Sequence, residues 1–144
     1  MDSHRHGPHS VYSIHLHLVW VTKYRKSALA GAVGVRVRDL IREICGVHDV
    51  HIIRGHVSRD HVHLLVSIPP QLAVSRLVQR LKGKTGYKLL QEFAHLRKQF
   101  WGRHLWARGY FCCSSGQVTD EVVAKYIENQ GRGDAEFGVE GSPE

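Results

Sequence analysis

Apolar residues follow a pattern typical of β-strands in three segments of the chain. Val11 to Lys23 has apolar residues at every second position before both of its faces become apolar. Val47 to His56 and His61 to Ile68 are also rich in apolar residues, and four residues separate them. A two-residue period is typical of β-strands, and a four-residue connection is an ordinary hairpin length. We therefore predict three strands, the last two forming a hairpin.

Apolar residues spaced three or four apart predict two helices in the first hundred residues. One runs from about Ser27 to Cys45, and Gly46 then stands where a glycine commonly ends a helix. The other begins after a pair of prolines, runs from Val74 to Phe93, and is interrupted at Gly83 to Gly86. Each helix keeps one apolar stripe, which indicates packing on a sheet.

The last third of the chain predicts one more strand and one more helix. Aromatic residues in Gly109 to Ser114 favour a strand. Thr119 is a suitable N-cap, and the two acidic residues after it favour a helix from about Thr119 to Gln130. The glycine-rich, acidic segment 131–144 is expected to be disordered.

The resulting order is strand, helix, strand, strand, helix, strand, helix. It predicts an α+β fold of the ferredoxin-like or RRM-like type, a four-stranded antiparallel sheet with helices packed on it, plus a C-terminal helix. A length of 144 residues, 42% of them apolar, suits one core. We expect a single domain over residues 1–130, followed by the tail.

Charge suggests a polyanionic partner. The whole chain has a formal charge of +7, and the tail 131–144 carries one arginine against four acids, so residues 1–130 carry +10. Nucleic acid is the commonest partner of so basic a domain, although a charge run is also often an ordinary solvated surface. The candidates for DNA contact are Lys23, Arg25, Arg76, Arg80, Lys82, Lys84 and Lys88.

Cysteine use and hydropathy indicate a cytoplasmic protein. Cys45, Cys112 and Cys113 are odd in number and imply no disulfide framework. No apolar run approaches the roughly 18 residues of a membrane span, and Met1 to Pro8 lacks the apolar core of a signal peptide. We expect no membrane association.

His61 and His63 are candidate metal ligands. Residues two apart on a strand point to the same face, so both imidazoles lie together while Val62 turns into the core. Imidazole is the commonest side-chain ligand of divalent metals, but two ligands make only half of a site. His15 and His17 have the same spacing, so spacing alone does not separate the two pairs.

Tyr126 and Gln130 are candidates for a nucleophile and a further ligand. They are four apart on the last predicted helix and therefore share a face. If that face meets the histidine strand, the site combines two imidazoles, an amide oxygen and a phenol, a set that suits Mn²⁺ or Mg²⁺. A divalent ion polarises a phosphorus centre. The tyrosine needs that metal or a nearby cation to favour the phenolate, and Lys125 or a lysine of the helix Val74 to Phe93 is a candidate for that cation. Without such a context, Tyr126 is an ordinary packing residue and Gln130 is solvated.

Four segments in order resemble the transposases of the insertion sequence 200/605 family, the single-tyrosine branch of the HUH nucleases. They are Trp20 to Arg25, Arg59 to Pro69 with its two histidines, Gly109 to Phe111, and Tyr126 to Gln130. The similarity extends over about Tyr12 to Gln130.

This resemblance implies a transposase that cleaves and rejoins single-stranded DNA at hairpin-bearing element ends in a prokaryotic cytoplasm. Tyr126 would form a 5′-phosphotyrosine, and His61, His63 and Gln130 would hold the metal. It also implies a homodimer, in which the tyrosine helices can be exchanged between subunits. Ser114 to Val118 is compatible with a flexible connection to that helix.

Two other functions remain open from the residues. An RRM-like module that binds single-stranded nucleic acid without catalysis would present Tyr12, Trp20 or Tyr110 to stacked bases. A two-histidine phosphoesterase would use His15 and His17 as its second motif and would need no tyrosine.

Overall fold

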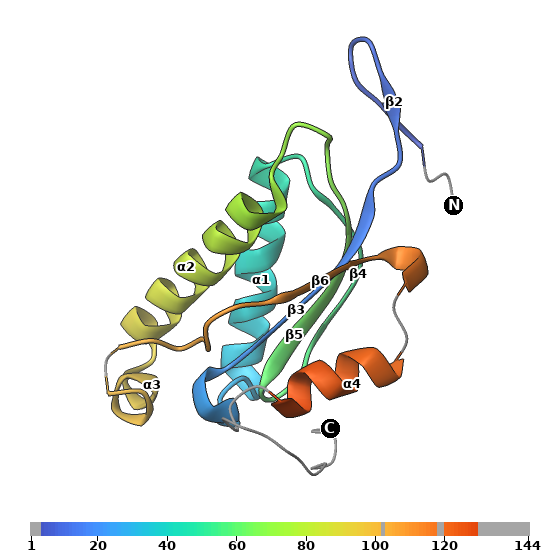
Figure 1. Cartoon of the computed structure of the whole chain (residues 1–144). Helices are drawn as coiled ribbons and strands as arrows, with labels where there is room; N and C mark the ends of the chain where they lie inside the picture. The colour runs from blue at the N-terminus through green and yellow to red at the C-terminus, as the bar shows by residue number, and fades with distance from the viewer. Residues whose placement is uncertain (1–3, 102, 118–119, 130–144) are drawn as a thin grey trace.

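A four-stranded antiparallel sheet forms the centre of the molecule (Figure 1). The computed structural model describes residues 4–101, 103–117 and 120–129. The strands lie in the order β4, β5, β3, β6, with bounds β3 His15–Val21, β4 His51–Val57, β5 His61–Ser67 and β6 Phe111–Ser114. The order is that of a ferredoxin-like sheet, so the predicted fold class is confirmed.

Helices cover both faces of this sheet. α1 (Gly31–Val47) and α2 (Val74–Glu92) lie side by side on one face, and the short α3 (Ala94–Gln99) follows α2. α4 (Asp120–Asn129) lies on the opposite face, in orange-red at the lower right of Figure 1. No helix in the described part of the chain is long and apolar enough to cross a membrane.

Strand alternation divides the apolar residues between the two faces. On β5, Val62, Leu64 and Val66 point into the main core with α1 and α2. On β3, Leu18 and Trp20 do the same, whereas Val19 and Val21 belong to a second, smaller cluster with α4. The sheet therefore supports two apolar layers, and the second one fixes the position of the C-terminal helix.

The predicted strand Val11 to Lys23 is wrong in its extent. The segment divides into β2 (Val11–Tyr12) and β3, and β2 pairs with β1 (Arg5–His6), a strand that the sequence pattern did not predict. The β1–β2 hairpin projects beyond the sheet in Figure 1. The apolar alternation continues from β2 into β3. It therefore does not indicate where pairing with β1 ends and pairing with β5 begins.

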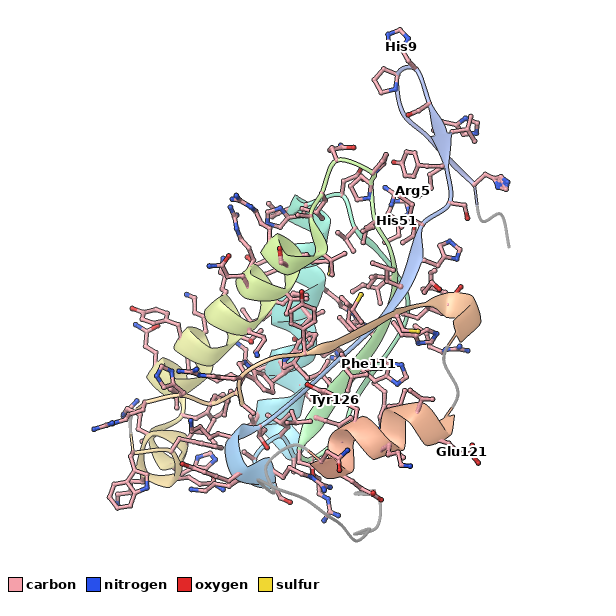
Figure 2. The ribbon with its side chains drawn as sticks, in the orientation of Figure 1. Arg5, His9, His51, Phe111, Glu121 and Tyr126 are labelled. Atoms are coloured by element: carbon pink, nitrogen blue, oxygen red, sulfur yellow. The ribbon has the colours of Figure 1, made fainter. Side chains whose placement is uncertain are left out.

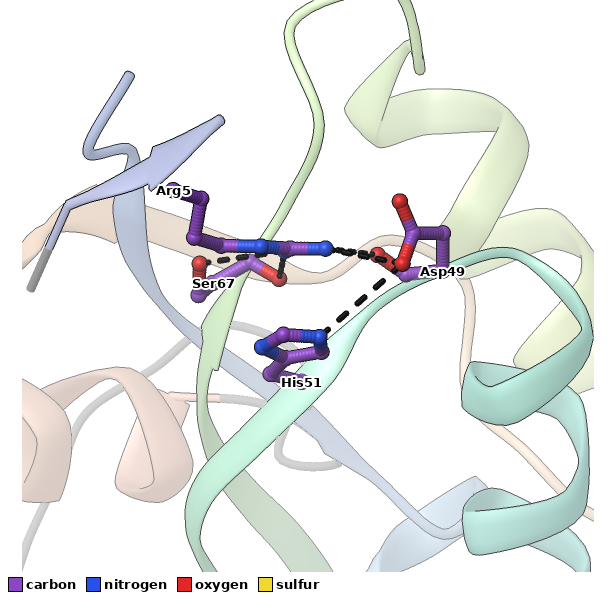
Figure 3. A network of polar contacts seen from close by, with 4 residues as sticks. All are labelled: Arg5, Asp49, His51 and Ser67. Carbon is purple, nitrogen blue, oxygen red and sulfur yellow. Dashed lines mark hydrogen bonds and ion pairs between the residues drawn. The ribbon is translucent and has the colours of Figure 1, made fainter. Parts of the chain in front are cut away.

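Arg5 fastens this hairpin to the body (Figure 3). Its guanidinium donates to the carbonyl and hydroxyl oxygens of Ser67 at 3.0 and 3.2 Å, and to the carbonyl and carboxylate of Asp49 at 3.0 and 2.8 Å. The imidazole of His51 lies 3.9 Å from the same Asp49 carboxylate.

The ends of the first helix differ from the prediction. α1 begins at Gly31 and not at Ser27, because the N–H groups of Ala28 and Leu29 donate to the Arg59 carbonyl at 3.0 and 2.8 Å and hold that segment against the hairpin turn. Gly46 is inside the helix. The residue with the left-handed backbone after the helix is Asp49, at φ 59°.

The second helix is continuous from Val74 to Glu92, so the predicted interruption at Gly83 to Gly86 is wrong. Thr85 between the glycines is fully buried, and its hydroxyl donates to the Leu81 carbonyl at 2.6 Å. Trp106 covers Gly86, with its indole N–H donating to Thr85 Oγ1 at 2.9 Å. Tertiary packing thus compensates for the low helix propensity of glycine.

Candidate active site

β5 places His61 and His63 on the sheet face that α4 covers. Because successive side chains of a strand alternate, the two imidazoles point away from Val62 and the main core. His61 is buried and His63 is half-buried. The two imidazoles therefore lie on the same face of the sheet, as predicted from the spacing.

An ionised carboxylate orients His61. Asp60, in the turn before β5, has its Oδ1 3.0 Å from His61 Nδ1, and Arg25 donates to its Oδ2 from Nε at 3.2 Å. Burial raises the pKa of Asp60, but the hydrogen bond from His61 and the charge of Arg25 outweigh it, so the pKa lies below its usual value. With a carboxylate as partner, Nδ1 carries the ring proton, which leaves the Nε2 lone pair to bind a metal.

Asp60 was not singled out in the sequence, and Arg25 was assigned there to DNA contact. The structure pairs their side chains, with an Arg25 Nη2 to Asp60 Oδ2 distance of 3.2 Å. Arg25 sits in a short 3₁₀ turn, η1 (Lys23–Arg25), where it and Tyr24 have left-handed φ values of 53° and 58°. The only sequence signal of this pairing was the position of Asp60 next to a candidate ligand.

His17 supports the second histidine. Its Nδ1 lies 2.9 Å from His63 Nε2, and the ring centroids are 5.2 Å apart. Burial, together with the charge of Arg54, lowers the pKa of His17, so its ring is neutral at neutral pH. Of the two histidine pairs with equal spacing, β3 therefore contributes one member to this site, while His15 lies opposite Ser67.

Apolar packing holds α4 over the same face. Val123 and Ile127 pack on Val19 and Val21 of β3. In the β3–β5 register Val19 is the partner of His63, and Val21 is the partner of His61. Tyr126, between the two anchoring positions of the helix, thus lies on the histidine face of the sheet.

Tyr126 is enclosed as a neutral phenol. Its ring lies 5.6 Å from that of Phe111 on β6 (Figure 2), and its hydroxyl is buried without a hydrogen-bond partner among the described residues. Burial raises the pKa of Tyr126 to about 12. The phenol therefore needs activation before it can attack an electrophile.

Comparison with known proteins shows the family to which the chain belongs. The family model described as "Transposase IS200 like" matches residues 10–130. The chain belongs to this family. The transposase is 35% identical over 120 residues to the ISDra2 transposase TnpA of Deinococcus radiodurans, which covers 83% of the chain and 86% of that relative.

Further relatives agree with this assignment. The transposase for insertion sequence element IS200 of Salmonella typhimurium is 32% identical over 85% of the chain and 80% of its own length. A crystal structure of a proposed transposase from Deinococcus radiodurans has a TM-score of 0.81 and 32% identity, and covers 88% of this chain and 97% of that one. A tyrosine transposase bound to a REP hairpin has a TM-score of 0.54 at 10% identity, over 87% and 68% of the two chains, and shows the shared fold.

The donor set of the transposase fits a divalent metal in part. His61 Nε2 faces away from its Asp60 contact, and His63 lies beside it on the same strand face. In the described part of the chain, no group of three or more His, Cys, Asp or Glu side chains is placed to hold a metal. A third protein ligand would be of another type or would come from another segment. Gln130 lies outside the described residues, so its role stays a prediction.

The predicted DNA-binding residues of the transposase lie on η1 and α2, and some of them contact other parts of the fold. Lys82 donates to the carbonyls of Ala107 and Gly109 at 2.8 and 2.7 Å, and burial lowers its pKa. Arg80 lies 3.4 Å from the His48 ring after α1. The others lie on η1 or along α2, namely Lys23, Arg25, Arg76, Lys84 and Lys88.

Proposed function

We propose that this transposase cleaves and rejoins single-stranded DNA through a covalent phosphotyrosine at Tyr126. His61, His63 and Gln130 would hold a divalent ion, Mg²⁺ or Mn²⁺. The observation that carries the proposal is the packing of α4 on Val19 and Val21, the register partners of the two histidines, because it puts a phenol and two imidazoles on one sheet face.

The proposed step is an exchange of phosphate esters. The Tyr126 oxygen bonds to phosphorus, the bond from phosphorus to the 3′-oxygen breaks, and the phenol proton is in effect replaced by a proton on the released 3′-hydroxyl. Attack of a 3′-hydroxyl on the phosphotyrosine reverses the step and rejoins a strand. When bound, the metal polarises the scissile phosphate and offsets its growing negative charge.

The residues around the two candidate ligands support this chemistry by fixing their rings. Asp60, itself paired with Arg25, holds the His61 proton on Nδ1, and His17 contacts His63. A carboxylate partner such as Asp60 orients a metal ligand and raises its basicity.

A DNA hairpin is the partner that we propose for the transposase. The related tyrosine transposase that shares its fold is bound to a REP hairpin, and the excess of basic residues in 1–130 suits a polyanion. We also propose a homodimer, as the family resemblance implies. In the described chain α4 packs on its own β3, which supports a site assembled within one subunit.

The RRM-like alternative is disfavoured by the same packing. A base-stacking module needs an open sheet face with aromatic rings, but α4 covers β3 on one side and α1 and α2 cover the other. Trp20 is fully buried and Tyr110 packs against the main core.

The decisive experiment is trapping of a covalent adduct. The protein is incubated with single-stranded oligonucleotides that carry the element ends, with and without Mg²⁺, and analysed under denaturing conditions. We expect a metal-dependent adduct with the wild type and none with Tyr126→Phe, which keeps the ring and loses only the nucleophile. Tyr24→Phe, an exposed tyrosine, is the matched control and should form the adduct. Equal products from the wild type and Tyr126→Phe would refute the mechanism.

A further inference from the structure

A basic hollow lies at the second half of α2, on the side of the sheet away from α4. Its volume is about 730 Å³. It is lined by α2, α3, the segment before β6 and Lys23. Its cationic lining residues are Lys23, Lys82, Arg97, Arg103 and Arg108, and none of the described residues that line it is acidic. We name it the α2 groove.

Two of these cations hold the walls. Lys82 donates to the carbonyls of Ala107 and Gly109, and Arg97 donates to those of Leu90 and Gln91 at 2.8 and 2.9 Å. Both side chains thus bind backbone carbonyls at the walls of the groove. Arg103 and Arg108 are exposed and are the groove's candidates for an anionic ligand.

Two glycines of α2 line the groove without side chains, and an exposed aromatic ring lies next to them. An added Cβ at Gly83 would meet nothing within 4 Å, and Gly86 lies against the Trp106 ring. Tyr87 lines the same groove with 66% of its surface exposed. An exposed aromatic ring among cations is the combination that binds unpaired bases, since the ring stacks on a base while the cations contact the backbone.

The groove begins next to the candidate active site. Val21 is the register partner of His61, and Lys23 follows two residues later on the rim of the groove. A DNA strand bound at the His61 end of β5 would therefore reach the groove at Lys23.

We infer that the α2 groove binds a single-stranded DNA segment that flanks the cleavage site, with a base stacked on Tyr87 and phosphates on Arg103 and Arg108. This inference rests on the proposed function. A duplex stem is a less suitable occupant, because its bases are already stacked on each other and cannot cover the Tyr87 ring.

The test measures binding of a fluorescent oligothymidine by anisotropy, with every variant also carrying Tyr126→Phe so that no cleavage interferes. Tyr87→Ala should weaken binding about 5- to 100-fold, and Tyr87→Phe, which keeps the ring, by no more than about twofold. Arg103→Ala and Arg108→Ala should each lower the slope of log affinity against log salt by about 0.7.

Gly83 offers a matched pair of variants. Gly83→Glu puts a carboxylate at the open floor position and should weaken binding, whereas Gly83→Ala adds a methyl group in open space and should not. Both variants should keep the wild-type circular dichroism spectrum, which separates blockage from misfolding.

Two results would overturn the inference. Unchanged oligothymidine affinity in Tyr87→Ala and Gly83→Glu would show that no strand occupies the groove. Binding of a hairpin-duplex oligonucleotide is measured as a second probe. If Arg103→Ala and Arg108→Ala weaken hairpin binding while Tyr87→Ala changes the affinity for neither probe, the groove binds the backbone of a duplex. Failure of the proposed function is distinct, because it appears as the absence of an adduct in protein with a wild-type groove.

Discussion

At the scale of single residues, burial sets the reactivity of this candidate site. The Tyr126 hydroxyl has no partner among the described residues, whereas Asp60 is surrounded by donors. Desolvation disfavours the charged form of a group and hydrogen bonding to that form favours it, so the two pKa values shift in opposite directions. The site thus combines a neutral phenol, the candidate nucleophile, with an ionised carboxylate that orients a candidate ligand.

The first prediction concerns titration of Tyr126 in the metal-free protein. Ultraviolet titration of tyrosinate in the wild type, minus that of Tyr126→Phe, should reveal one phenol with a midpoint near 12. A folded-state pKa above the unfolded value of 10.0 means that this phenol stabilises the fold fully below about pH 10. That stability is lost as the pH rises through about 12. A difference spectrum centred at pH 10 would show that the phenol is solvated.

Asp60→Asn should weaken metal binding and the fold together. We expect metal affinity, measured by calorimetry, to fall about 10- to 100-fold because the ring of His61 loses its anionic partner. The free energy of unfolding at neutral pH should fall by about 1.5–3 kcal/mol, since Arg25 loses a charged hydrogen bond.

The pH dependence of this stability difference gives the check. The folded-state pKa of Asp60 lies below 3.8, so its stabilising contribution is present above that pH and is lost as the pH falls through the folded-state value. The difference between wild type and Asp60→Asn should therefore narrow in acid. Asp39→Asn, which removes an exposed carboxylate, is the control and should change neither quantity. A difference that stays constant into acid would mean that Asp60 is not ionised in the fold.

At the scale of elements, glycines inside the two long helices have opposite roles. Gly83 of α2 faces open space. Gly34 of α1 lies so close to the Leu29 carbonyl that any Cβ there would clash with backbone. The first glycine weakens its helix, and the second allows the helix start to approach the segment before it.

Alanine substitution should separate these roles. Gly83→Ala is expected to raise the free energy of unfolding by about 0.5–1 kcal/mol, because alanine restricts the unfolded chain and favours the helix. Gly34→Ala is expected to lower it by about 1–3 kcal/mol, because the backbone must move to accept the methyl group. Denaturant unfolding measures both. Stabilisation by Gly34→Ala would contradict the close approach described for α1.

At the scale of the whole molecule, the question is whether a site is built within one subunit. α4 carries Tyr126, and the two histidines lie on β5. Only the packing of α4 on β3, the neighbour of β5, brings them to one face. In an exchanged dimer the same packing would join α4 to the partner's sheet.

Mixing two inactive variants distinguishes these arrangements. Tyr126→Phe and a variant with both His61→Ala and His63→Ala are co-purified as the proposed homodimer in mixed form and assayed for adduct formation. With α4 on its own sheet, each subunit lacks one component and the mixture should be inactive. Recovery of about half of the wild-type adduct would demonstrate exchange of the tyrosine helices.

Local sequence pattern determined the type and order of the main elements and the faces of the strands. The two-residue period of β5 follows from backbone geometry alone, so Val62 and His63 are assigned to opposite faces without any knowledge of neighbours. The order of elements, together with the motifs shared with the transposase family, was enough to predict the fold class that the structure and the comparisons confirm.

Tertiary structure alone decided which polar groups meet. Arg25 and Lys82 look alike in sequence as candidate DNA contacts, yet one pairs with Asp60 and the other binds the Ala107 and Gly109 carbonyls. His17 meets His63 although their positions lie 46 residues apart. Such partners depend on which segments become neighbours when two apolar layers are buried, and a buried polar group then binds whatever partner lies within reach. The local period of a strand predicts the face to which a side chain points. The partner of that side chain depends on which segments the fold brings together.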